Sequence, residues 1–151
     1  MNINFCLASK DPDGNPTNGI IRKFTNKSGF SLYDTTINYN ATGGSDAWDS
    51  ERYLNIWVCN IYGGILGWAQ FPYAGTKETD GVVINHDNFG INLNYSSAYN
   101  LGRTTTHEVG HWLNLFHVWG DNTCGDDFVF DTPTQEQANY GCKIHPHISC
   151  Q

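Results

Sequence analysis

Hydrophobic and polar positions alternate along parts of the first half of the chain and change period in one later segment. Residues 53–61 are rich in β-branched and aromatic side chains and are apolar on both faces, which predicts a strand inside a sheet. Residues 65–71 predict a further strand, and the proline that follows them suits a sheet edge. Shorter strands are expected at residues 1–7 and 81–85.

The hydrophobic period becomes helical between residues 100 and 116. Val109, Trp112, Leu113 and Phe116 are spaced three or four residues apart, as on one face of an α-helix. The chain after residue 117 contains scattered glycines and is expected to be loop. Because 151 residues fit one compact domain, the pattern predicts a single mixed fold of strands and a helix.

The net charge of the chain limits the classes of partner that it is expected to bind. The net charge of -7 argues against nucleic acid or an anionic membrane surface, because phosphates are bound by clustered Lys and Arg. No stretch approaches the ~20 apolar residues that cross a bilayer. Residues 1–5 also lack the features of a signal peptide. We therefore expect neither a nucleic-acid nor a membrane partner.

The helical segment contains the sequence HEVGH at residues 107–111. His107 and His111 are four residues apart, so both imidazoles can bind one metal ion, with Glu108 beside them. His117 follows six residues later and is the candidate third ligand of a catalytic zinc ion. His117 can bind the same metal ion only if the helix ends before it and the backbone turns back. Such a turn needs a residue in the left-handed conformation, which Asn114 tolerates.

The same residues have a simpler interpretation. Thr105 and Glu108 have the spacing of a capping box, and the histidines would then be solvated residues on a polar helix face. Three histidines at metal-ligand spacing favour the zinc site. The chemistry expected there is hydrolysis of peptide bonds, with Glu108 as the base that accepts a proton from a zinc-activated water.

Residues 106–117 resemble the zinc motif of the pappalysin family of metzincin peptidases, and the similarity extends to residues 53–59, 67–72, 80–84 and 131–133. The resemblance implies a secreted endopeptidase with an α+β fold, in which a twisted mixed sheet packs on the active-site helix. It also implies that protein or peptide substrates pair with an edge strand. The residues that match this strand are Gly67, Trp68, Ala69 and Gln70.

The resemblance also divides the chain into an N-terminal subdomain, residues 1–117, and part of a C-terminal subdomain, residues 118–151. Two departures from the family stand out. Asn114 occupies the position of a family glycine, and the methionine turn that lies beneath the zinc has no counterpart, since the only methionine is Met1. The chain is therefore expected to end before that turn.

The five cysteines are unevenly distributed. Cys124, Cys142 and Cys150 lie in the loop-rich C-terminal third, where a disulfide stabilises most, and this favours an oxidising compartment. The resemblance implies that Cys124 pairs with Cys150, while Cys142 stays unpaired because its family partner would lie beyond Gln151. Cys6 and Cys59 are expected to be free thiols that behave as small hydrophobic residues.

Calcium is a second candidate cofactor, because family members bind it near the cleft. The acidic loop offers the hard oxygen ligands that calcium prefers, from Asp121, Asp126, Asp127, Asp131 and the Thr132 hydroxyl. A solvated acidic loop beside turns explains the same residues.

Three functions from different classes remain open. They are a zinc endopeptidase, a catalytically impaired zinc-binding fragment that binds peptides, and an aromatic-rich adhesion domain with an accidental motif. Stoichiometric zinc would exclude the third function, and cleavage of an unstructured protein would separate the first from the second.

Overall fold

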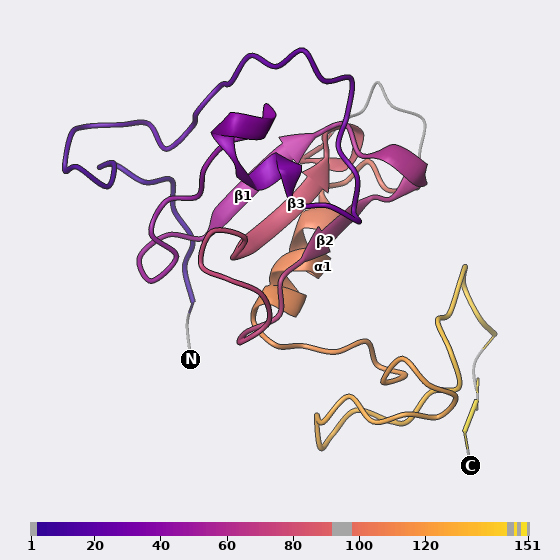
Figure 1. Cartoon of the computed structure of the whole chain (residues 1–151). Coiled ribbons are helices and arrows are strands. Elements are labelled where there is room, and N and C mark those ends of the chain that lie inside the picture. The colour runs from indigo at the N-terminus through magenta and orange to yellow at the C-terminus, as the bar shows by residue number, and fades with distance from the viewer. Residues whose placement is uncertain (1–2, 92–97, 145–146, 148, 151) are drawn as a thin grey trace. The chain divides into compact units, whose positions relative to one another are not determined.

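The computed structural model describes residues 3–91, 98–144, 147, 149 and 150 (Figure 1). The chain forms two compact units, Met1–Trp112 and Leu113–Gln151. This boundary lies shortly before residue 117, where the resemblance divides the subdomains, and that division stays a prediction. Among the described residues, no helix is both long and apolar enough to cross a membrane.

The first unit contains a three-stranded mixed sheet, with β1 at Asn55–Cys59, β2 at Gly67–Ala69 and β3 at Gly81–Asn85. The strand order is β1-β3-β2, so β3 is central (Figure 1). β1 runs parallel to β3 with Trp57 opposite Val83, and β2 runs antiparallel to β3 with Trp68 opposite the same residue. The sheet predicted from the family resemblance is thus confirmed as mixed.

The core lies on both faces of β3. Val82, Val83 and Ile84 are at most 2% exposed, and successive side chains of a strand point to opposite faces. Val83 joins an apolar cluster on one face with Phe30, Ile37, Trp57 and Ile61. The other face of the sheet carries the helix α1, Arg103–Trp112, which contacts β2 and β3 (Figure 1).

Four 3-10 turns complete the first unit, at Thr36–Asn38, Asn40–Thr42, Tyr62–Gly64 and His86–Asn88. The third contains Gly63 and Gly64, and both glycines adopt positive φ angles, of 84° and 73°. Glycine reaches this region without steric cost because it lacks Cβ.

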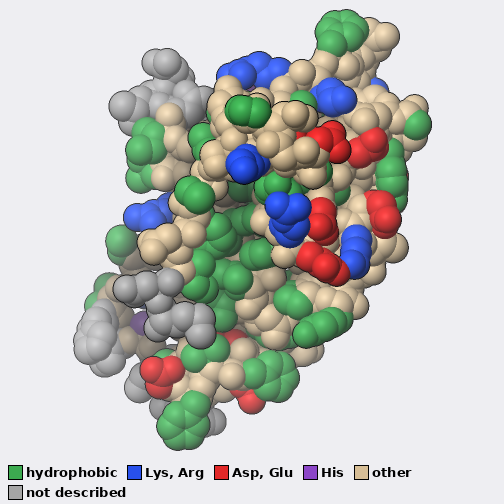
Figure 2. Space-filling model, turned by 90° about the vertical axis from the view of Figure 1, so that its left-hand side faces the viewer, with side chains coloured by type: hydrophobic (Ala, Val, Ile, Leu, Met, Phe, Trp, Pro, Cys, Tyr) green, Lys and Arg blue, Asp and Glu red, His purple; other side chains and the backbone are tan. Residues whose placement is uncertain are grey.

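Residues 53–61 were predicted to form a strand inside the sheet; the strand is present, but its predicted interior position was wrong. β1 forms within this range but is an edge strand. Trp57 is buried in the core, whereas Ile56 and Val58 on the opposite face are 41% and 43% exposed. Figure 2 views the molecule from the side on which β1 lies in Figure 1, and hydrophobic side chains gather across the middle of this face.

Two other predicted strands differ from the structure. The strand expected at residues 1–7 is absent from its described part, residues 3–7, which are all exposed and thus have no hydrophobic face in a core. The strand expected at 65–71 is shorter, at Gly67–Ala69, and is confirmed as an edge strand. The strand at 81–85 is confirmed.

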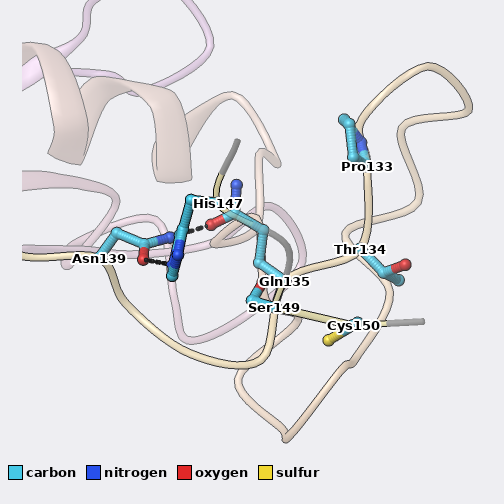
Figure 3. Close-up of a pocket in the computed structure, with 7 residues that line it drawn as sticks. All are labelled: Pro133, Thr134, Gln135, Asn139, His147, Ser149 and Cys150. Carbon is cyan, nitrogen blue, oxygen red and sulfur yellow. Dashed lines mark hydrogen bonds between the residues drawn. The ribbon is translucent and has the colours of Figure 1, made fainter. Parts of the chain in front are cut away.

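The second unit contains neither a helix nor a strand among its described residues. A disulfide joins Cys124 to Cys150, as the resemblance implies, and Cys142 is free and exposed. The disulfide lies beside a pocket of about 280 Å³ lined by Pro133, Thr134, Gln135, Asn139, His147, Ser149 and Cys150. Figure 3 shows the His147 ring turned toward Asn139, with the two side chains 3.0 Å apart.

The environments of the cysteines predict their reactivity. Burial raises the pKa of the Cys59 thiol to about 11, so at pH 8 only about 0.1% of it is the reactive thiolate. Alkylation of the native protein at pH 8 should therefore modify the exposed Cys6 and Cys142 rapidly and Cys59 only after denaturation. Peptide mass spectrometry would check this, and modification of Cys124 without a reducing agent would contradict the disulfide.

Candidate active site

The helix α1 depends on the sheet for its stability. It has only ten residues, fewer than the about 12–15 that an isolated helix needs in water. It also contains three threonines, a valine and a glycine, which are all weak helix formers. Packing on β2 and β3 supplies the stability that the helical propensity of the segment does not provide. The helix is therefore held at a fixed place on the sheet.

A hydrogen bond fixes the C-terminal end of this helix. The Trp112 indole Nε1 donates to Asp80 Oδ1 over 2.7 Å, and Asp80 directly precedes β3. The neighbouring His111 ring also lies against the ring of Phe71, with centroids 5.1 Å apart. The last turn of α1 is therefore tied to segments at the ends of both β2 and β3.

His107 and His111 lie on the same face of α1, as their spacing predicts. Their Nε2 atoms are 3.0 Å apart, and their rings are nearly perpendicular. Two imidazole nitrogens bound to one tetrahedral zinc ion would be about 3.3 Å apart, given zinc–nitrogen distances of about 2.0–2.1 Å. The pair therefore fits a single transition-metal ion.

His117 completes the group of histidines. The helix ends at Trp112, and Asn114 adopts a φ angle of 72°, which confirms the predicted left-handed turn. One ring nitrogen each of His107, His111 and His117 lies within 4.8 Å of the other two. Three neutral nitrogen donors with room for a fourth ligand are the set that a catalytic zinc ion prefers.

Glu108 lies between the first two histidines in sequence and is only 7% exposed. Burial raises the pKa of its carboxyl group to about 7. Gly67 of β2 allows this approach, because a Cβ there would come within 3.0 Å of Glu108 Cγ and 2.9 Å of the Val83 carbonyl oxygen. The carboxyl group thus sits directly beside the edge strand.

The simpler interpretation of this helix is not supported. In a capping box the threonine hydroxyl accepts a hydrogen bond from a backbone N–H at the helix start. Thr105 instead lies within α1, and its Oγ1 is buried without a hydrogen-bond partner. The pair of Thr105 and Glu108 therefore does not cap the helix.

The predicted substrate-binding residues occupy the edge of the sheet. Gly67, Trp68 and Ala69 form β2, which pairs with β3 along one side only in the strand order. The Trp68 side chain packs against the core cluster. Gln70 follows the strand and closes the next loop, since its amide donates to the Thr76 carbonyl oxygen.

The acidic residues proposed for calcium do not form a comparable group. Within the described part of the chain, only the three histidines bring three or more potential metal-ligating side chains together. Asp126 and Asp127 accept hydrogen bonds from the backbone N–H groups of Phe128 and Val129, respectively. These bonds stabilise turns, and calcium binding by Asp126, Asp127, Asp131 and Thr132 stays a prediction.

The family profile of peptidase M43, described as pregnancy-associated plasma protein-A, matches residues 23–150. The chain belongs to this peptidase family. An extracellular metalloprotease of Neurospora crassa is 38% identical over 124 residues, which cover 72% of this chain and 42% of the fungal protein. A second, from Colletotrichum graminicola, is 47% identical over 87 residues, which cover 52% of this chain and 30% of the relative.

Solved structures of mirolysin are also similar to this chain. The structure of Tannerella forsythia mature mirolysin in complex with a cleaved peptide superposes with a TM-score of 0.91 at 48% identity. The match covers 97% of this chain and 56% of mirolysin. The chain thus spans less than half the length of the two fungal relatives and little more than half that of mirolysin.

Two hydrogen-bonded contacts of the site were not predicted from the sequence. The bond from Trp112 to Asp80 joins residues 32 positions apart. Its one partial signal is that Asp80 begins the segment 80–84, whose sequence resembles the family. The contact of His117 with Asp121 spans only four residues. An acidic residue four positions after a candidate histidine ligand is a local signal of such a supporting hydrogen bond.

Trp112→Phe should lower the free energy of unfolding by about 1–3 kcal/mol, because it leaves the half-buried Asp80 carboxylate without its indole donor. Asp80→Asn is the matched control, since its side-chain oxygen can still accept the bond. Urea unfolding would measure both variants. Equal losses of stability in the two would show that the hydrogen bond is not the reason.

Burial of Glu108 predicts a pH dependence of stability in the metal-free protein. The pKa of its carboxyl group is about 7 in the folded chain and 4.5 in the unfolded chain, so between these values the folded state binds more protons. The contribution of Glu108 to stability is then fully present below pH 4.5 and is lost as the pH rises through 7. Unfolding of wild type and Glu108→Gln in a chelator across this range would measure it, and parallel curves would refute it.

Proposed function

We propose that this chain carries the active site of a zinc-dependent endopeptidase. The observation that supports the proposal best is the gathering of three imidazole nitrogens, all within 4.8 Å of one another, in a chain of a peptidase family. His107, His111 and His117 would each give one nitrogen to the metal. When bound, zinc supplies a Lewis acid that polarises a carbonyl group and lowers the pKa of a water ligand to about 7.

Glu108 is the proposed general base and then the general acid. It would accept a proton from the attacking water and pass it to the amine that leaves when the peptide bond breaks. A side chain does both best when its pKa lies near the working pH. Burial of Glu108 raises its pKa to about 7, which supports this role before any contribution from the metal.

The substrate is proposed to be an extended peptide segment. The outer edge of β2 would pair with the peptide backbone as an added strand, which holds the scissile bond largely independently of side chains. Gly67 places this edge beside the Glu108 carboxyl group. The related structure of mirolysin is described as a complex with a cleaved peptide, and this supports the same class of substrate here.

The proposed site of action is outside the cell. The chain contains the Cys124–Cys150 disulfide, and disulfides generally persist in oxidising compartments and are rare in the cytosol. The fungal relatives are named extracellular metalloproteases. Both facts support secretion of the protein.

Glu108→Gln tests the proposal directly. It keeps the size of the side chain but removes the base, so cleavage of casein should fall by about 10²–10⁴-fold, while zinc stays at about one ion per chain. Glu136→Gln, at an exposed position of the second unit, is the control and should retain activity.

Two results would overturn this assignment. Zinc bound without any cleavage by the wild type would favour the catalytically impaired fragment that binds peptides. Equal cleavage by wild type and Glu108→Gln would remove Glu108 as the base. Inhibition of the wild type by 1,10-phenanthroline, reversed by added zinc, would connect the cleavage to the metal.

A further inference from the structure

The third histidine lacks the support that the first two receive. His107 and His111 are oriented by the helix on which they lie, but His117 follows α1 by several residues and lies in a segment without helix or strand. An imidazole on such a segment can rotate about two side-chain bonds and can carry its proton on either nitrogen. A metal ligand needs one ring orientation and one tautomer.

A carboxylate fixes the tautomer of His117. Its Nδ1 lies 2.6 Å from Asp121 Oδ1, a distance at which Nδ1–H donates to the carboxylate. With the proton held on Nδ1, the lone pair is on Nε2, the nitrogen on the opposite side of the ring. The Asp121 side chain is 57% exposed, so the pair adds little stability, and its effect is on orientation.

An aromatic ring fixes the plane of the same imidazole. The Trp119 ring is stacked on the His117 ring, with centroids 4.3 Å apart and planes inclined by 4°. Rotation of His117 about its Cβ–Cγ bond would break this contact and the hydrogen bond to Asp121 together. The two neighbours thus restrain the ring in complementary ways, one at its edge and one on its face.

The backbone between these residues forms a closed turn. The N–H of Gly120 donates to the His117 carbonyl oxygen over 2.7 Å, and the N–H of Gly125 donates to the Trp119 carbonyl oxygen over 3.1 Å. Gly120 has a φ angle of 57°, and a Cβ there would come within 2.5 Å of the Asp126 backbone. Asp121 is itself left-handed, with a φ angle of 55°, a conformation that Asp tolerates better than most residues.

We propose that Asp121 and Trp119 are positioning residues that hold His117 with its Nε2 directed at the metal. The inference rests on the proposed zinc site and assigns Asp121 a different role from the calcium ligand that the sequence suggests. The inference can be tested by measuring zinc affinity, without any measurement of peptidase activity. Loss of the carboxylate should weaken zinc binding by about 10–100-fold, the usual effect of removing the hydrogen-bond partner of a ligating histidine.

The experiment measures zinc affinity by competition with a chromophoric chelator in wild type, Asp121→Ala, Asp121→Asn and Glu136→Ala. Asp121→Ala should lose the 10–100-fold expected of such a partner, and Asp121→Asn should lose less, because the amide oxygen still accepts from Nδ1–H. Glu136→Ala removes a charge from the same unit at an exposed position and should bind zinc as the wild type does. The absorption spectrum of the cobalt-substituted protein should change in Asp121→Ala only.

Folding is monitored separately by the content of the Cys124–Cys150 disulfide in each metal-free variant. If Asp121→Ala fails to form the disulfide, Asp121→Asn and Trp119→Ala carry the test, and a loss of affinity in Trp119→Ala supports the inference. Wild-type affinity in every folded variant at position 121 overturns it and leaves the zinc site standing. Absence of zinc from the wild-type protein overturns the proposed function and this inference together.

Discussion

The packing of α1 on the central strand β3 is the interaction on which the site depends. Val82 and Ile84 are completely buried, and they lie on the face of β3 opposite Val83, where α1 contacts the sheet. Without that surface a ten-residue helix rich in threonine would not be stable in water. The positions of His107, Glu108 and His111 thus follow from burial of apolar side chains that take no part in the chemistry.

The three histidines are held in place by two kinds of contact. One kind joins segments that are distant in the sequence, and the other joins residues within one turn. The two helical histidines are held in place by the sheet, because the Trp112 indole bonds the end of α1 to Asp80, directly before β3. His117 depends on contacts that span only a few residues, with Trp119 and Asp121. Since these contacts are formed within one short turn, His117 is oriented by its own segment.

The sequence predicted most of the site because its signals are local. The spacing of His107 and His111 on a helix, and the need for a left-handed residue at Asn114, follow from backbone geometry alone. The disulfide between Cys124 and Cys150 was correctly implied by the family resemblance. The histidine spacing and the turn depend on one short motif, so they could be predicted without knowledge of the rest of the chain.

The errors of sequence interpretation concern contacts between distant segments. Residues 53–61 are apolar on both faces, but no local signal tells whether a second strand lies beyond β1, where Ile56 and Val58 are partly exposed. The alternating pattern at residues 1–7 was equally ambiguous, because a strand also needs a neighbour for its backbone groups. The bond between Asp80 and Trp112 likewise depends on how the chain returns to the sheet.

Burial makes the protonation of Glu108, the proposed base, sensitive to a metal bound beside it. A carboxyl group that is 7% exposed favours its neutral form, and its pKa of about 7 reflects this. A divalent cation held by the neighbouring histidines would favour the charged form instead, since opposite charges within about 4–6 Å lower a carboxyl pKa. Binding of a metal and release of the Glu108 proton would therefore be coupled. Near neutral pH the metal-free site would thus hold Glu108 in a mixture of protonated and charged forms, and a cation bound by the three histidines would shift it toward the carboxylate.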